Sequence, residues 1–304
     1  MKLLITGASG YLGSSLFSDL QREHDVIGTY GNNQVPGLLP LQVTDRDDVF
    51  RVLRHERPDA VIHCASTAKG EFDRDQSSDA LDRLVRVNVE GTQNMMKGAG
   101  EIGAPFVYIS SPTVFEGREG PFTEEDAMGT DDKYGQTRIA AEEIVRDSGL
   151  SHVIIRPSMI VGVSPRGMDR KFFGKVAHAI KTNTSADLDG EWRFAPSWNH
   201  HIASVIDWWI SQKNKDEVHL LHVVTPEITT QLELAQKICV QLGVDHSLFQ
   251  KKEPPWDGAN NILDGSKLKM VQAPTVGLDE VVSHIARELQ NPTTPEGNPP
   301  YFKR

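Results

Sequence analysis

Short apolar runs alternate with longer amphipathic stretches through the first half of the chain. The short runs are apolar at consecutive positions, which is typical of strands buried on both faces of a parallel sheet. These strands are predicted at residues 2–5, 25–29, 60–64, 106–110 and 152–156, with helices between them at 11–22, 45–55, 81–99 and 133–147. The helix at 45–55 has Thr44 or Asp45 as its N-cap and ends before Pro58. The pattern predicts an α/β fold with a Rossmann-type doubly wound parallel sheet.

The second half is less regular. Helices are predicted at residues 172–181, 202–212, 231–242 and 278–289, a further strand of the main sheet at 218–224 and a short Asn-rich strand at 260–263. Residues 190–199 are expected to form a loop, and residues 291–300 form a Pro-rich tail. We therefore expect a main Rossmann domain at residues 1–162, continued by about 202–242. A smaller interleaved α/β region is expected at residues 163–201 and 243–304.

Composition narrows the class of protein. The 304 residues are 38% hydrophobic and 24% charged, as in ordinary globular proteins. The formal net charge of −10, without a Lys/Arg stripe, argues against a nucleic-acid partner. Cys64 and Cys239 stand in apolar runs and are not expected to pair, which favours a reducing compartment. No apolar run approaches 18 residues and the first strand begins at once, so we expect a cytoplasmic protein without a membrane partner.

Three glycines join the first predicted strand to the first predicted helix. Gly7 permits a tight turn, Gly10 lets the backbone approach a pyrophosphate, and Gly13 lets the helix lie close to the strand. The first-turn N–H groups and the helix dipole then face the negative charge. The segment predicts a phosphate cradle for a dinucleotide, to which Ser9, Tyr11 and Leu12 also belong.

This opening and four later segments resemble the extended short-chain dehydrogenase/reductases. Residues 59–66 resemble the family's fourth strand and the loop beside its cofactor, and 87–92 a helix with a structural Asn. Residues 109–117 resemble the strand that carries the catalytic Ser or Thr, and 134–138 stand at the Tyr-x-x-x-Lys position. Within the superfamily, the runs at 41–45, 109–117, 134–138, 155–158 and 263–268 are most similar to the dTDP-4-dehydrorhamnose reductases.

The resemblance implies a catalytic group of Ser111, Tyr134 and position 138. Hydride transfer to a carbonyl leaves an alkoxide that needs a proton, and a tyrosine, with a pKa normally about 10, supplies it when a nearby cation lowers that pKa. Residues four apart share one face of a helix, so Tyr134 and Arg138 point to the same side. Ser111 would polarise the carbonyl oxygen. Arg138 replaces the family's Lys, and because Arg is longer, planar and forked, both an active enzyme and a protein that has kept only the cofactor fold stay open.

The resemblance also implies which residues contact ligands. Those expected at the cofactor, besides the glycine loop, Tyr134 and Arg138, are Tyr30, Gln42, Val43, Cys64, Ala65 and Ser66. Those expected at the substrate are Thr113, Met159 and Asn199, with Met159 in place of the Trp usual in the rhamnose branch. Residues 28–33 lack the acid that would hold an NAD ribose, which favours NADP(H) and leaves NAD(H) open.

The expected function is reduction of a keto group, with a nucleotide-activated sugar of the 4-dehydrorhamnose type or a related carbonyl compound as substrate. One alternative is a catalytically inactive NADP-binding regulatory subunit of another enzyme, and a second is an NAD-dependent sugar-nucleotide epimerase or dehydratase. By analogy we expect a homodimer through the helices at 81–99 and 133–147. No metal site is predicted, because the adjacent His200 and His201 would face about 100° apart on a helix. These histidines are expected at the surface or in the substrate loop, and the acidic run at 124–126 is expected at the surface, with a divalent-ion site as the alternative.

Overall fold

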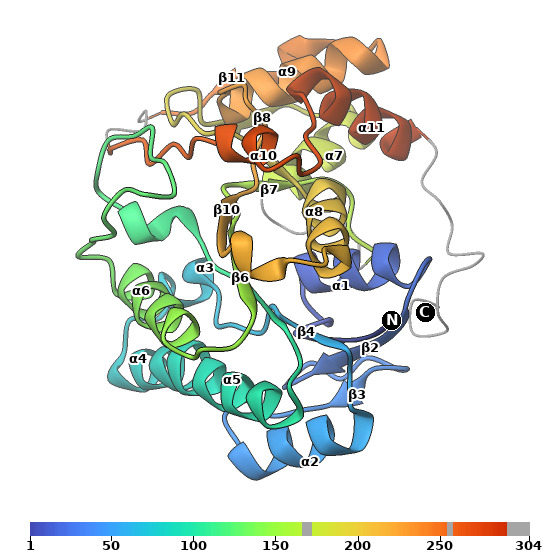
Figure 1. Ribbon diagram of the computed structural model, residues 1–304. Coiled ribbons are helices and arrows are strands. Elements are labelled where there is room, and N and C mark those ends of the chain that lie inside the picture. The colour runs from blue at the N-terminus through green and yellow to red at the C-terminus, as the bar shows by residue number, and fades with distance from the viewer. Residues whose placement is uncertain (166–171, 254–257, 291–304) are drawn as a thin grey trace.

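A seven-stranded sheet forms the centre of the computed structural model, which describes residues 1–165, 172–253 and 258–290 (Figure 1). Every neighbouring pair of its strands is parallel, and the order is β10-β6-β5-β4-β1-β2-β3. The strands are β1 (Lys2–Thr6), β2 (Asp25–Tyr30), β3 (Leu39–Pro40), β4 (Ala60–His63), β5 (Phe106–Ile109), β6 (His152–Arg156) and β10 (Leu220–His222). The chain order reverses next to β1, so the sheet is of the Rossmann type and ligands are expected at the carboxyl ends of its strands.

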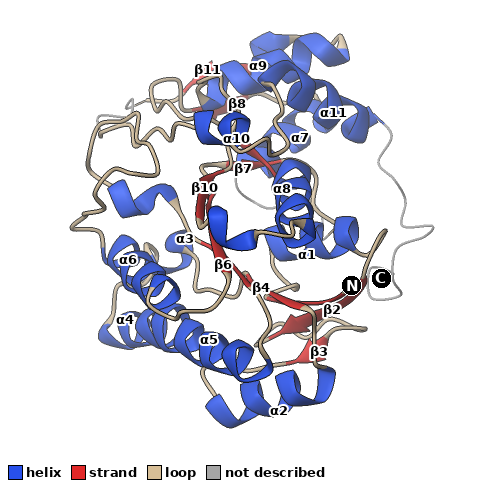
Figure 2. Cartoon of the chain, viewed as in Figure 1, coloured by secondary structure: helices blue, strands red, loops and turns tan. Residues whose placement is uncertain are grey.

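Helices cover both faces of the sheet (Figure 2). Helices α1 (Tyr11–Leu20) and α8 (Asn199–Ser211) pack on the face that receives Leu3 and Ile5. On the other face, Leu4 packs with α2 (Arg46–Glu56), α5 (Gly91–Ile102) and α6 (Lys133–Arg146). The strands are apolar at consecutive positions because adjacent side chains enter opposite, equally buried layers.

The long helix predicted at 81–99 consists of three parts in the structure. It begins earlier as α4 (Ser78–Val85), widens into a π-helical turn (Arg86–Glu90) and continues as α5 (Gly91–Ile102). Such turns are often associated with functional sites, and here the turn carries the fully buried Asn88. The Asn88 amide accepts from Thr67 N at 2.9 Å and donates to Thr137 Oγ1 at 3.2 Å, which ties α6 to the segment after β4.

A second apolar cluster lies beyond the carboxyl ends of the main strands, at the top of Figure 1. It contains α7 (Phe172–Thr182), α9 (Gln231–Leu242) and α11 (Leu278–Gln290), beside the parallel pair β8 (Ala186–Leu188) and β11 (Phe249–Lys251). Helix α9 packs here through its apolar residues rather than on the main sheet with which the 202–242 segment was grouped. The other predicted domain boundaries stay a prediction.

Three details of the structure differ from the sequence-based expectation. Residues 190–199 are not a continuous loop, because β9 (Ser197–Trp198) pairs with β7 (Ile160–Val161) and α8 already begins at Asn199. The strand expected at 260–263 is absent from the described residues, where Leu263 forms only one isolated bridge, with Phe122. Short elements such as α3 (Lys69–Phe72) and α10 (Ser266–Met270) were not predicted, since they have too few residues to show a period. The Pro-rich tail lies outside the described residues.

Across these described ranges, no helix is long and apolar enough to cross a membrane. Cys64 and Cys239 are both free thiols. Within the same ranges, no group of three or more His, Cys, Asp or Glu side chains could hold a metal ion.

Candidate active site

The glycine loop between β1 and α1 is shaped by close backbone contacts. Gly7 has a positive φ of 67°, and a Cβ there would lie 2.8 Å from the Cα of Ala65. A Cβ on Gly13 would lie only 2.3 Å from the Gly7 carbonyl oxygen. No side chain caps α1, and its first turn carries no acid. The helix terminus is therefore free of a built-in anion, and the residues fit a dinucleotide pyrophosphate.

A buried hydrogen-bond chain fixes the loop that faces these glycines. Thr6 Oγ1 accepts from the backbone N–H groups of Cys64 and Ala65 at 3.2 and 3.1 Å, which leaves its own proton for His63 Nδ1 at 2.7 Å. His63 Nε2 then donates to Thr92 Oγ1 at 3.2 Å. Burial, with the Arg138 charge, lowers the pKa of His63 to about 3, so the ring is neutral. His63 is thus a core residue with both ring nitrogens hydrogen-bonded.

Tyr134 and Arg138 are in direct contact on the buried face of α6. Arg138 Nη2 donates to Tyr134 Oη at 2.8 Å, and its guanidinium carbon lies 4.8 Å from the centre of the Tyr134 ring. Asp132 caps the helix by accepting from Gly135 N at 2.8 Å, and its other oxygen pairs with Lys69 Nζ at 2.5 Å. The helix start that carries Tyr134 is therefore held from two sides.

Arg138 has spare donor capacity. Arg138 is only 4% exposed, and its Nε is buried without an acceptor in the described part of the chain. A hydroxyl of a bound nicotinamide ribose is an acceptor of the required kind. The orphaned N–H and the glycine cradle together fit a nicotinamide dinucleotide.

Ser111 is oriented by Thr113, two residues further along the chain. Ser111 Oγ accepts from the Thr113 backbone N–H at 3.3 Å and from the Thr113 hydroxyl at 3.0 Å. Both side chains are buried, at the start of the 3₁₀ turn Pro112–Phe115 that follows β5. Because Ser111 Oγ already accepts twice, its own proton is directed to a further acceptor. Thr113, predicted as a substrate contact, is seen here as a partner of Ser111.

The next turn of α6 carries a buried carboxylate that does not reach Arg138. Glu142 accepts from Ser110 Oγ at 2.6 Å, from Arg156 Nε at 2.8 Å and Nη2 at 2.7 Å, and from Arg146 Nη2 at 3.0 Å. Four donors occupy its two oxygens. The charge of Arg138 is therefore left for the Tyr134 side of the site.

The remaining predicted cofactor residues lie along the carboxyl edge of the sheet. Tyr30 ends β2, Val43 is buried, and Gln42 is exposed with its amide 3.5 Å from Asn32 Oδ1. Cys64 and Ala65 are partly buried beside Gly7, and Ser66 is exposed. Burial raises the pKa of the Cys64 thiol to about 12, against a smaller opposite effect of Arg138. Cys64 is therefore a neutral thiol at the site.

Two predicted substrate residues, Met159 and Asn199, differ in burial and in hydrogen bonding. Met159 is partly buried against the second apolar cluster. Asn199 is fully buried, and its amide donates to Ser15 Oγ at 2.9 Å and to the Val163 carbonyl at 2.8 Å. Both amide hydrogens are thus used within the chain. A role of either residue at the substrate stays a prediction.

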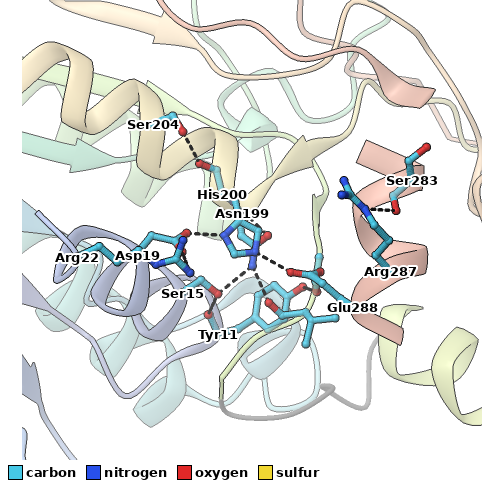
Figure 3. Close-up of polar contacts among 12 residues, drawn as sticks. Tyr11, Ser15, Asp19, Arg22, Asn199, His200, Ser204, Ser283, Arg287 and Glu288 are labelled. Carbon is cyan, nitrogen blue, oxygen red and sulfur yellow. Dashed lines mark hydrogen bonds and ion pairs between the residues drawn. The ribbon is translucent and has the colours of Figure 1, made fainter. Parts of the chain in front are cut away.

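The two adjacent histidines are packed at the start of α8, so the expectation of surface or loop histidines is wrong. Figure 3 shows the His200 ring between Asp19 of α1 and Glu288 of α11. Its Nδ1 lies 2.5 Å from Asp19 Oδ2 and its Nε2 3.0 Å from Glu288 Oε1. His201 is buried, with Nε2 2.8 Å from the Pro274 carbonyl.

The acidic run at 124–126 is only partly at the surface. Glu124 is 8% exposed, and its Oε1 accepts from His222 N at 2.7 Å. Burial raises the pKa of Glu124, against hydrogen bonds that lower it.

Sequence reasoning missed Tyr108 and Lys69. Tyr108, fully buried in β5, accepts from Arg138 Nη1 at 3.0 Å. A Tyr within an otherwise apolar buried strand is a usable signal, because its hydroxyl needs a partner. Lys69 offered no such signal, since its partner Asp132 is 63 residues away.

Comparison with known proteins places this geometry in context. The family model described as RmlD substrate binding domain matches residues 1–260. The computed structure is similar to the crystal structure of dTDP-4-dehydrorhamnose reductase from Bacillus anthracis in complex with NADP, with a TM-score of 0.79 and 21% identity. The match covers 94% of this chain and 99% of that one, and it establishes the fold.

Two kinds of curated protein are related in sequence. Methionine adenosyltransferase 2 subunit beta from Danio rerio is 30% identical over 279 residues, 89% of this chain and 84% of that protein. Its counterpart from Rattus norvegicus is 28% identical over 208 residues, 67% of this chain, which thus spans only 60% of that relative's length. The probable low-salt glycan biosynthesis reductase Agl14 from Haloferax volcanii is 27% identical over 260 residues, 82% of this chain and 83% of that protein.

Proposed function

The chain belongs to the RmlD substrate binding domain family of extended short-chain dehydrogenase/reductases, and we propose that it is an NADP(H)-dependent reductase of a keto group on a nucleotide-activated sugar. The observation that carries the proposal is the contact of Arg138 with the Tyr134 hydroxyl at 2.8 Å. A buried cation on a phenol favours the anionic state of that phenol, which is what a tyrosine acid must reach after giving up its proton.

Each of the three residues has a distinct task in this proposal. A bound NADPH would supply the hydride. Ser111, whose oxygen already accepts from Thr113, donates its proton to the substrate carbonyl and polarises it. Tyr134 gives its proton to the developing alkoxide, and Arg138 stabilises the phenolate that remains. NADP(H) is favoured over NAD(H) because residues 28–33 carry no acid to repel a 2′-phosphate.

Tyr134→Phe tests the proposal. The variant keeps the ring but has no proton to give, so kcat is expected to fall by about a hundred- to ten-thousandfold. NADPH binding, followed by its fluorescence, is expected to stay within about twofold of wild type. The assay measures NADPH oxidation with a panel of 4-keto sugar nucleotides. Undiminished turnover in the variant would contradict the role of Tyr134.

A second candidate is a cofactor-binding subunit of another enzyme. It is favoured by the likeness to methionine adenosyltransferase 2 subunit beta and by Arg138 in place of Lys. It predicts tight NADPH binding, no oxidation of the bound NADPH by any panel member, and a stable complex with a partner enzyme. The same fluorescence experiment with wild type therefore separates the two candidates.

The homodimer through α4, α5 and α6 stays a prediction. Sedimentation velocity of the purified protein tests it, and a monomer at every accessible concentration would contradict it.

A further inference from the structure

The guanidinium of Arg138 is shared between two phenols. Nη2 donates to Tyr134 Oη at 2.8 Å, whereas Nη1 donates to Tyr108 Oη at 3.0 Å and, more weakly, to the Ile109 carbonyl at 3.4 Å. Tyr134 is at the proposed site, but Tyr108 is fully buried in β5. The two terminal nitrogens of the guanidinium thus bond to two different layers of the fold, helix α6 and strand β5.

Tyr108 is itself held rigidly. It is 0% exposed, and its ring stacks on His63 with 6.1 Å between centroids and 25° between planes. His63 is fixed by Thr6 and Thr92 through the buried chain below the glycine loop. The hydroxyl of Tyr108 is therefore a stationary acceptor.

Without Tyr108, Nη1 of the guanidinium would keep only the Ile109 carbonyl, at 3.4 Å, as an acceptor among the described residues. Glu142, one turn further along α6, is occupied by Ser110, Arg146 and Arg156. A poorly paired buried guanidinium nitrogen costs free energy, so the group would shift toward the Ile109 carbonyl and away from Tyr134. A lysine has a single ammonium on a flexible stem and does not need a second fixed acceptor to reach one hydroxyl.

We propose that Tyr108 is a positioning residue that adapts the site to an arginine at position 138, by holding one end of the guanidinium so that the other end meets Tyr134. The inference rests on the proposed function for its catalytic consequence, but not for its effect on cofactor binding. It makes a specific claim of dependence: Tyr108 matters because position 138 is Arg.

A double-mutant cycle tests the claim, with Tyr108→Phe made in wild type and in the Arg138→Lys variant. The Kd for NADPH and the kcat with a 4-keto sugar nucleotide are measured for all four proteins, and thermal unfolding verifies that each is folded. In wild type, Tyr108→Phe is expected to raise Kd and lower kcat by about tenfold, the loss of one charge-assisted hydrogen bond. In the Arg138→Lys background, the same change is expected to alter either quantity by less than about twofold.

The outcomes separate this inference from the proposed function. Equal losses in both backgrounds would overturn it, because Tyr108 would then have only a general packing role, and so would the absence of any loss in wild type. Coupling in Kd without turnover in any of the four proteins would support the positioning role and contradict the reductase. Turnover without coupling would support the reductase and contradict the positioning role of Tyr108. Failure of wild type to bind NADPH or NADH would overturn both.

Discussion

Glu142 and Arg156 are both fully excluded from water, yet the carboxylate has a donor on every available side. Burial of a charge is unfavourable unless it is paired and hydrogen-bonded, and this pair is completed by Ser110, Arg146 and the His222 ring. Burial, followed by the Arg156 charge, lowers the pKa of His222 to about 3, so the ring adds no third positive charge. At the scale of single residues, stability at this site depends on a hydrogen-bond partner for every buried charged group.

Glu142→Ala leaves Arg156 buried without its carboxylate and is expected to lower the free energy of unfolding by about 3–5 kcal/mol. The neighbouring Glu143 is exposed, and Glu143→Ala is expected to change it by less than about 0.5 kcal/mol. Urea denaturation followed by circular dichroism measures both variants. Similar effects of the two changes would show that the network is not what stabilises α6.

Helix α1 depends on glycine at one position for its place in the fold. Gly13 lies against the Gly7 carbonyl, whereas Gly100, in α5, would have no neighbour within 4 Å of an added Cβ. Two helical glycines thus differ in what surrounds them. A glycine in open space only weakens its helix, but a glycine in close contact sets the distance between two elements.

Gly13→Ala is expected to displace α1 from the loop and to weaken NADPH binding by at least about a hundredfold, because the backbone N–H groups no longer converge on the pyrophosphate. Gly100→Ala is expected to leave binding unchanged and to stabilise the protein by about 0.5–1 kcal/mol. Fluorescence titration and urea denaturation test the pair. Tight binding by the Gly13 variant would mean that the glycine loop is not the phosphate site.

Sequence patterns predicted the elements that have a strong period. The five strands predicted in the first half, the parallel sheet and the helix at 231–242 follow from apolar spacing. Of the two N-cap candidates, Thr44 and Asp45, it is Asp45 whose side chain accepts from the N–H groups of Asp47 and Asp48. The start of α8 was missed because Asn199 and the two histidines bond to distant partners and have no apolar period. The Tyr134–Arg138 contact was predictable from its spacing along one helix, whereas Tyr108 required knowledge of which strand lies under α6.

At the scale of the whole molecule, His200 links a helix near the start of the chain with the last described helix. Its ring connects α8 with α1 of the Rossmann sheet and with α11 of the second apolar cluster (Figure 3). Among the described residues, the charged and titratable groups near it are Asp19 on α1, Arg22 just after α1, and Arg287 and Glu288 on α11, while the His284 ring of α11 contacts Trp198, as the His200 ring does. Burial opposes a charge on His200, but the hydrogen bonds that its ring donates to Asp19 and Glu288 outweigh it and raise its pKa to about 9.

This raised pKa gives the protein a predictable pH dependence. The stabilisation by charged His200 is complete below about pH 6.5 and is lost as the pH rises through about 9. Relative to His200→Gln, wild type is expected to lose on the order of 3 kcal/mol of unfolding free energy across that interval. The exposed His178 provides a control, since His178→Gln should keep the wild-type pH dependence. If the free energy of unfolding of wild type and of the His200→Gln variant changed with pH to the same extent, this contribution would be ruled out.

The contacts of His200 join segments that are made at different times during synthesis. Asp19 precedes His200 by 181 residues, and Glu288 follows it by 88, so a ribosome makes the three contributors far apart in time. Helix α1 is translated early and can pack on the sheet, but its contact with His200 of α8 forms only after six of the seven sheet strands have been made, and the contact of His200 with Glu288 forms only with the last described helix. We expect chains halted before α11 to be cleaved faster by proteases at α1 than chains that include α11, although the glycine loop is already made. The contacts around the start of α8 are thus completed only once α11 has been made.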